Sequence, residues 1–417
     1  MSGFFRLTAR RVNTPAGIEP CELGESPTWD DEHQVLWWID ILGEALYIGQ
    51  PGENSPCDFD RVVKLPLHGH RPGFIVHASA ADVTSGGDAN KPALRCAAPY
   101  HAIWGSQQGL FYTCYSTSLP WHTTAQPIRH PPLSVSSTVQ HCRIAHFPQS
   151  LFQPQGGGRV YRFNDGKVGP DGSLWCGGMM ERTRSFPKRD RESGLLLQWI
   201  AGDSARTPSL STPSMASNGF SVGVPNVTVS NGIGWSPAGD VLYHIDTPAA
   251  VIRAYPYRGA RMADGSAGAL QKGGGVKEGG HVYWALPDAL RKRGATLDGL
   301  CVDTCGAVWV ALAGIGEVVR LQAGKAGGNV AEDVSITGVV RLPEVSLSTS
   351  CCFGGDDLTT LYITTARGTS KEAVASCNQG GAGWIYAANL KGIAKGMPAS
   401  RLRLPVSRLS ISNQHHL

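Results

Sequence analysis

Short apolar strands separated by polar turns recur along the chain. Residues 29–40 predict a strand, a polar turn and a second strand that is rich in Trp and Ile. Residues 235–246 repeat this pattern closely, and residues 169–177, 302–311 and 353–364 are further copies. In each copy a turn that contains Gly or Asp leads into an apolar, aromatic strand, which is typical of a β-hairpin.

Aromatic residues mark the second strand of each copy, and their spacing predicts the fold. These residues are Trp37, Trp175, Tyr243, Trp309 and Tyr362. The interval from Trp37 to Trp175 is about twice as long as the next one, so one unrecognised copy fits between them. Six copies of three or four strands predict an all-β protein, a six-bladed β-propeller. A pair of β-sandwiches is the alternative, but it does not explain a repeat of this period.

The composition fits this fold and narrows the choice of partners. With 52 Gly, 27 Pro and 17% charged residues, the chain suits short strands and tight turns better than helical bundles. Hydrophobic residues make up 41%, enough for a core, and no apolar run is long enough for a membrane helix. The net charge of +4 gives no reason to expect nucleic acid or a membrane as a partner. A monomer is expected.

The N-terminal residues and the cysteines favour a cytoplasmic protein. Residues 1–13 contain Arg but lack the apolar segment of a signal peptide. The 11 Cys are scattered and odd in number, and Cys351 and Cys352 are adjacent. Reduced thiols are therefore expected.

The whole chain, residues 1–417, is expected to form one propeller domain with insertions. Residues 89–164 contain no Asp or Glu, and the strand pattern is faint there. Residues 78–158 are therefore interpreted either as a degenerate blade with a long insertion or as a translated intron in the gene model. Residues 204–219 and 263–280 predict smaller exposed loops.

Polar residues at one phase of the repeat predict a site on the propeller axis. Glu25, Asn164, Asn231 and Asp298 each lie eleven or twelve residues before an aromatic marker, and each has Gly close by. Because the innermost strands of a propeller surround one axis, side chains at one phase meet at one end of it. Carboxylate and carboxamide oxygens suit Ca²⁺, Mg²⁺ or Mn²⁺. The alternative is that these residues only form turns.

At these same residues the chain resembles the SMP-30/gluconolactonase/LRE-like family. The matching segments are residues 23–27, 162–168, 229–233, 297–303 and 349–355. The strings RFNDGKV and TSCCFGG are the specific ones. The resemblance implies a six-bladed propeller with one divalent cation on its axis, of which Ca²⁺, Zn²⁺, Mn²⁺ and Mg²⁺ are candidates.

The resemblance also implies roles for individual residues. Glu25, Asn231 and Asp298 match the family's metal ligands, and Asp298 also matches its general base. Arg162 and Asn164 match its substrate-binding pair. The implied activity is hydrolysis of a sugar lactone, with the metal polarising the carbonyl and Asp298 activating water. A calcium-binding regulatory protein without turnover is the alternative.

One departure from the family pattern affects the substrate. The family usually has an acidic pair after the glycine-methionine strand, whereas this chain has Glu181 followed by Arg182. Arg182 thus occupies a position that often binds substrate hydroxyls, and Glu181 is the expected substitute. A different sugar specificity is therefore expected.

Overall fold

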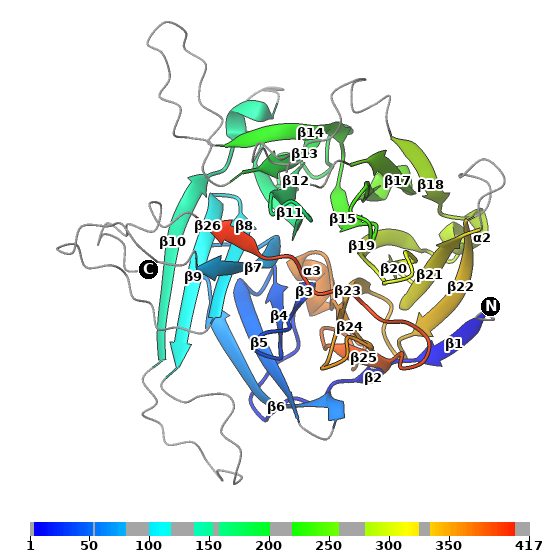
Figure 1. Cartoon of the computed structure of the whole chain (residues 1–417). Helices are drawn as coiled ribbons and strands as arrows, with labels where there is room; N and C mark the ends of the chain where they lie inside the picture. The colour runs from blue at the N-terminus through cyan, green and yellow to red at the C-terminus, as the bar shows by residue number, and fades with distance from the viewer. Residues whose placement is uncertain are drawn as a thin grey trace, which may run out of the picture.

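In the computed structural model, six largely antiparallel sheets surround one axis (Figure 1). The structure describes residues 4–52, 55–80, 100–117, 137–152, 158–200, 219–257, 280–324 and 334–404. This arrangement is a six-bladed β-propeller, so the predicted fold class is confirmed.

Each blade begins with an inner strand beside the axis and continues outwards in chain order, apart from the outermost strand of the sixth. The first contains β3 (Gly24–Asp30), β4 (Val35–Asp40), β5 (Ala45–Gly52) and β6 (Ser55–Pro66). The second contains β7 (Phe74–Ala80), β8 (Tyr100–Ser106), β9 (Gly109–Thr117) and β10 (Ser137–His146). The third contains β11 (Tyr161–Val168), β12 (Leu174–Met180), β13 (Gly194–Trp199) and β14 (Phe220–Val227). The fourth contains β15 (Ser230–Trp235), β16 (Val241–Asp246), β17 (Val251–Pro256) and β18 (His281–Ala285). The fifth contains β19 (Thr296–Val302), β20 (Val308–Ala313), β21 (Glu317–Ala323) and β22 (Val334–Arg341). The sixth contains β23 (Ser348–Gly354), β24 (Thr360–Thr365), β25 (Tyr386–Asn389) and β2 (Arg10–Arg11).

Within the described residues, helices lie only in the connections between strands. They are α2 (Asp288–Lys292), α3 (Lys371–Ala375) and the 3-10 turns η1 (Gln149–Leu151) and η3 (Thr247–Ala249). Among the described residues, none of the helices is long and apolar enough to span a bilayer.

The hydrophobic core is divided among the interfaces between blades. The innermost strands contact one another in a closed ring, and a separate apolar cluster fills each gap between neighbouring blades. Trp37, Trp175, Trp309 and Tyr362 are at most 1% exposed in these clusters, and Tyr243 is 8% exposed. The aromatic repeat seen in the sequence is therefore the packing surface that holds the blades together.

The first residues of the chain add outer strands to the fifth and sixth blades. Strand β2 pairs with β25 as the outermost strand of the sixth blade. Strand β1 (Phe5–Thr8) adds to the fifth blade by parallel pairing with β22. These pairings satisfy strand edges that would otherwise be exposed and close the ring.

The blade missing from the sequence repeat is the one formed by β7–β10. Its strands β8, β9 and β10 lie within residues 78–158, the window with the faint pattern. Residues 81–99, 118–136 and 153–157 of this window lie outside the described residues, and so do 201–218 and 258–279. That these segments are insertions stays a prediction.

Most of the described cysteines are reduced, as the sequence predicts. Nine described cysteines, Cys351 and Cys352 among them, are free. Cys114 is an exception, because it forms a disulfide.

The C-terminal segment crosses the end of the axis at which the inner strands finish, here called the far end. Gly396 bridges to Asp303 after β19, and β26 (Leu402–Leu404) then pairs in parallel with β7. Figure 1 shows this red segment running past the axis to β26. Leu402 is fully buried in the core between the second and third blades. The far end is therefore covered by the chain itself.

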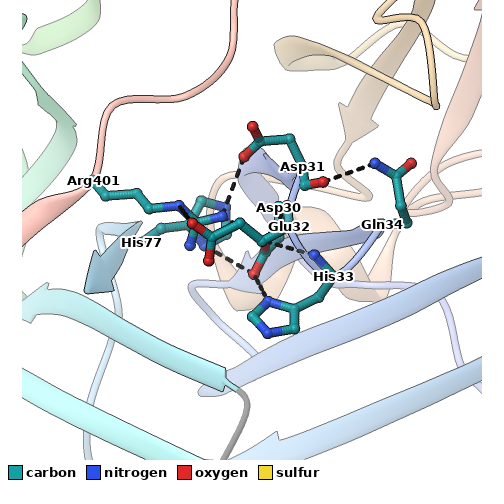
Figure 2. Close-up of polar contacts among 7 residues, drawn as sticks. All are labelled: Asp30, Asp31, Glu32, His33, Gln34, His77 and Arg401. Atoms are coloured by element: carbon teal, nitrogen blue, oxygen red, sulfur yellow. Dashed lines mark hydrogen bonds and ion pairs between the residues drawn. The ribbon is translucent and has the colours of Figure 1, made fainter. Parts of the chain in front are cut away.

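Arg401 anchors this crossing segment to the first blade (Figure 2). Its guanidinium donates to Asp30 Oδ1 at 2.7 Å and to Asp31 Oδ1 at 3.2 Å. Asp30 is 2% exposed, and its Oδ2 lies 2.8 Å from His33 Nδ1. Burial raises the pKa of Asp30, but His33, His77 and Arg401 outweigh it and hold this pKa below its usual range.

Replacing Arg401 with Gln should destabilise the propeller. The buried Asp30 carboxylate would lose a charged donor, at a cost of about 1–3 kcal/mol in the free energy of unfolding. Chemical denaturation would measure this, with Lys395→Gln as the matched control because Lys395 is exposed in the same segment. Equal loss in both variants would contradict an anchoring role for Arg401.

His77 should make stability fall as the pH is lowered. Burial lowers its pKa to about 4, although Asp30 opposes this and Arg401 adds to it. The unfolded chain therefore binds a proton at higher pH than the folded one, and the folded state loses stability as pH falls below the unfolded pKa. Between pH 7.5 and pH 5, wild type should lose about 2 kcal/mol more than His77→Gln. Parallel pH curves for the two proteins would contradict this prediction.

Candidate functional site

The inner strands carry a β-bulge near their first residues, at the end of the axis opposite the far end. In five of them the pairing register shifts, at 25–28, 163–166, 231–233, 297–300 and 348–350. A bulge adds a residue to one strand and redirects its side chains. The four residues that share one phase of the sequence repeat lie at or within these bulges.

Glycines beside these bulges let neighbouring inner strands approach closely. A Cβ on Gly232 would lie 2.8 Å from the carbonyl oxygen of Asp298, and one on Gly299 would collide with the Ser350 hydroxyl. Ser26, after Glu25, has a left-handed backbone with φ 49°. The Ser26 N–H donates to Glu25 Oε2 at 2.9 Å, which holds that carboxylate against its own strand.

A chain of hydrogen bonds joins the third blade to the fourth across the site. Arg162 Nη1 donates to Asn164 Oδ1 at 2.9 Å. Asn164 Nδ2 donates to Asn231 Oδ1 at 2.7 Å and to the Ser230 carbonyl at 2.8 Å. Asn231 Nδ2 donates to Thr247 Oγ1 at 2.7 Å. The structure therefore brings Asn164 and Asn231 together, as their common phase predicts, and Arg162 is bonded to this pair through Asn164.

Three carboxylates lie close enough to influence one another at this end of the axis. Burial, then Asp298 and Asp165, raise the pKa of Glu25 well above its usual value. Burial and Asp165 likewise raise the pKa of Asp298. Burial raises the pKa of Asp165 to about 6, although Lys167 and Arg162 oppose it. No ion pair with a basic side chain of the described residues neutralises any of the three.

This donor set fits a divalent cation. Crowded, buried carboxylates without a counter-charge are costly, and a dication removes that cost. Glu25, Asp298 and the Asn231 carboxamide oxygen, with Asp165 beside them, are ligands of the type that Ca²⁺, Mg²⁺ and Mn²⁺ prefer. The residues present therefore fit the cation that the family resemblance implies.

A second group of potential ligands lies at the far end. The ligand atoms of Asp30, Glu32 and His33 lie within 4.8 Å of one another. Arg401 already supplies a positive charge there, 2.7 Å from Asp30 and 3.3 Å from Glu32 (Figure 2). The axial carboxylates, which form no ion pair within the described part of the chain, are the better candidates for a metal site.

Glu181 lies beside the site, and two arginines hold it. Its Oε2 accepts from Arg162 Nε at 2.8 Å, and its Oε1 accepts from Arg71 Nη1 at 2.9 Å. Burial raises the pKa of Glu181, but the charges and hydrogen bonds of Arg162 and Arg71 more than offset this and lower it. Glu181 therefore orients Arg162 in this structure.

Two residues of the site were not among the sequence candidates. Asp165 follows Asn164 in the specific string RFNDGKV, so the sequence places it near the site but does not predict its role. Arg71 precedes β7 in the second blade, whose repeat is not recognisable in the sequence. No signal in the sequence places Arg71 beside Glu181.

The model of the SMP-30/Gluconolactonase/LRE-like region matches residues 23–367, which contain all side chains of the axial site and Glu181 and Arg71 beside it. The chain belongs to the SMP-30/gluconolactonase/LRE-like family.

Curated members of the SMP-30/gluconolactonase/LRE-like family align over most of the chain. A 6-deoxy-6-sulfogluconolactonase of Pseudomonas putida is 28% identical over 90% of this chain and 95% of its own. A regucalcin of Gallus gallus is 30% identical over 90% of this chain and 95% of its own. Among solved structures, a calcium-binding regucalcin from Agrobacterium tumefaciens has a TM-score of 0.60 at 19% identity. It covers 97% of this chain and 100% of its own, and it supports the fold.

Replacing Glu25 with Gln should weaken binding of a divalent cation. Removing one of the few ligand charges is expected to raise the dissociation constant at least about tenfold. Titration of chelator-treated protein with Ca²⁺ and Mn²⁺, followed by thermal unfolding, would measure this. Glu19→Gln is the matched control, because Glu19 is exposed and the charge change is the same. Equal metal-induced shifts in both variants would exclude Glu25 as a ligand.

Proposed function

We propose that the protein is a metal-dependent lactonase that hydrolyses sugar lactones. The observation that carries this proposal is the convergence of unneutralised carboxylates with the Arg162–Asn164–Asn231 network at one end of the axis. The family and the curated relatives support lactonase activity in general. A sugar lactone lactonase of Bacillus subtilis, described as putative, is another relative, 25% identical over 88% of the chain.

In this proposal Glu25, Asn231 and Asp298 hold the cation, which could be Ca²⁺, Zn²⁺, Mn²⁺ or Mg²⁺. When bound, it supplies a positive charge that polarises the lactone carbonyl and stabilises the oxyanion.

Asp298 accepts the proton of the attacking water. Its carboxylate can accept a proton from a water held within hydrogen-bond distance, about 3 Å. Asp298 is only partly exposed at the start of β19, and Thr247 Oγ1 fixes the preceding carbonyl, Leu297 O, at 2.8 Å. The backbone that carries the base is thus held in place.

Arg162 and Asn164 bind lactone hydroxyls. Arg162 is 5% exposed, and Glu181 and the Phe163 carbonyl fix its guanidinium plane. A donor oriented in this way loses little entropy when it binds substrate. Glu181 contributes by orienting Arg162.

A calcium-binding protein without turnover is the second candidate. Its supporting observation is that both oxygens of Glu181 are occupied by arginines, so the acid expected to bind sugar hydroxyls is engaged elsewhere. A panel of sugar lactones, assayed with metal-stripped and metal-restored protein, separates the candidates. Cation binding without hydrolysis of any lactone would favour the second one.

We further propose that the protein acts as a cytoplasmic monomer. Size-exclusion chromatography with light scattering and cell fractionation would test these two points.

Replacing Asp298 with Asn should abolish most hydrolysis while part of the metal binding remains. Asn keeps an oxygen ligand of the same size but cannot accept a proton, so kcat should fall about 10²–10⁴-fold. The assay would use one lactone panel at saturating Mn²⁺ or Ca²⁺, with Asp288→Asn as control because that side chain is 84% exposed. Near-normal kcat in Asp298→Asn would refute the proposed base.

A further inference from the structure

Guanidinium groups outnumber carboxylates at the rim of the proposed active site. The arginine rim consists of Arg71, Arg162, Arg182 and Arg189, and the carboxylate that pairs with it is Glu181. Arg71 and Arg162 share Glu181, at 2.9 and 2.8 Å. No carboxylate of the described chain forms an ion pair with Arg182 or Arg189. The rim therefore has an excess of positive charge.

This rim connects directly to the proposed substrate-binding residues. Asn231 is hydrogen-bonded to Asn164, Asn164 to Arg162, Arg162 to Glu181 and Glu181 to Arg71. The arginine rim is thus connected to Asn231, a proposed metal ligand, through Arg162 and Asn164.

Arg189 shows that the excess charge is not fully screened by solvent. The guanidinium is partly buried, and its Nε donates to the Met180 carbonyl at 2.8 Å. Burial, then the charges of Arg162 and Arg182, lower the pKa of Arg189 to about 10, and Glu181 opposes them only weakly. A partly buried cation near others of the same sign is stabilised by a bound anion.

The sequence of the rim loop shows the same imbalance. Residues 181–192, between β12 and β13, carry Arg or Lys at five positions and Asp or Glu at three. Asp190, one of these acids, pairs with Arg159 at 2.6 Å, so it does not neutralise the rim. Arg182, which takes the place of an acid in the family pattern, adds to the excess.

We propose that the arginine rim binds an anionic group of the substrate, so that the substrate class is sugar lactones bearing a phosphate, sulfonate or carboxylate. The inference rests on the proposed lactonase function. Guanidinium groups suit such groups because they donate paired N–H bonds to planar or tetrahedral oxyanions. The axial carboxylates and the arginine rim would then hold opposite ends of one molecule, the ring carbonyl at the cation and the anion at the rim.

The test compares lactones that differ in charge. Glucono-1,5-lactone and its 6-phospho and 6-sulfo derivatives, together with a glucaric acid lactone, would be assayed with metal-loaded protein. We expect kcat/KM to be at least about tenfold higher for an anionic lactone than for the neutral one, a preference that falls as salt is raised. The three anionic substrates show which oxyanion is preferred.

Variants assign the preference to the arginine rim. Arg182→Gln and Arg71→Gln should each lower the ratio of anionic to neutral kcat/KM about tenfold, whereas Lys188→Gln, an exposed control on the same loop, should change it less than about twofold. A neutral lactone preferred by wild type, or a ratio unchanged in both arginine variants, would overturn the inference and leave the lactonase proposal intact.

A binding measurement tests anion binding by the arginine rim independently of lactone hydrolysis. Calorimetric titration with 6-phosphogluconate and with gluconate needs no hydrolysis. Tighter binding of 6-phosphogluconate by wild type, lost in Arg182→Gln, would support the arginine rim even if no lactone were hydrolysed. Equal affinities for the two acids would overturn it, whatever the lactone assay shows.

Discussion

The mutual repulsion of buried carboxylates at one end of the propeller axis determines the chemistry of this protein. Glu25, Asp165 and Asp298 lie near the beginning of the inner strands. Burial raises the pKa of all three, and the charge of Asp165 adds to this effect at Glu25 and Asp298. Such an arrangement is stable only if the rest of the fold enforces it. The closed ring of blades does so, since the inner strands pack against one another around the whole axis.

Carboxylates lie at both ends of the axis, but their charges are neutralised differently. At the far end, Asp30 is 2% exposed and its charge is met by Arg401, which the C-terminal segment carries across the axis. At the other end no basic side chain of the described residues pairs with the axial carboxylates. One acidic group is therefore neutralised by the chain, and the other is available to an external cation.

The sequence predicts those parts of the fold and site that depend on local repetition. The hairpin repeat and the aromatic markers predict six blades. The common phase of Asn164 and Asn231 predicts their contact, because β11 and β15 each carry a bulge near their first residues. The second blade escapes recognition because 19 residues separate β7 from β8, where the other inner hairpins have a turn of four or five residues. Arg71 lies at the start of that blade, so its contact with Glu181 is set by the tertiary fold alone.

The proposed preference for anionic lactones follows from the positive charge of the arginine rim. Replacing an acid with Arg182 removes an acceptor for sugar hydroxyls and adds a positive charge to a rim that already contains Arg71 and Arg189. Glu181 does not restore the acceptor, because Arg71 and Arg162 occupy both of its oxygens. A neutral polyol would leave this positive charge unpaired, whereas an anionic group would neutralise it. We therefore expect the same substitution to disfavour neutral lactones and to favour anionic ones.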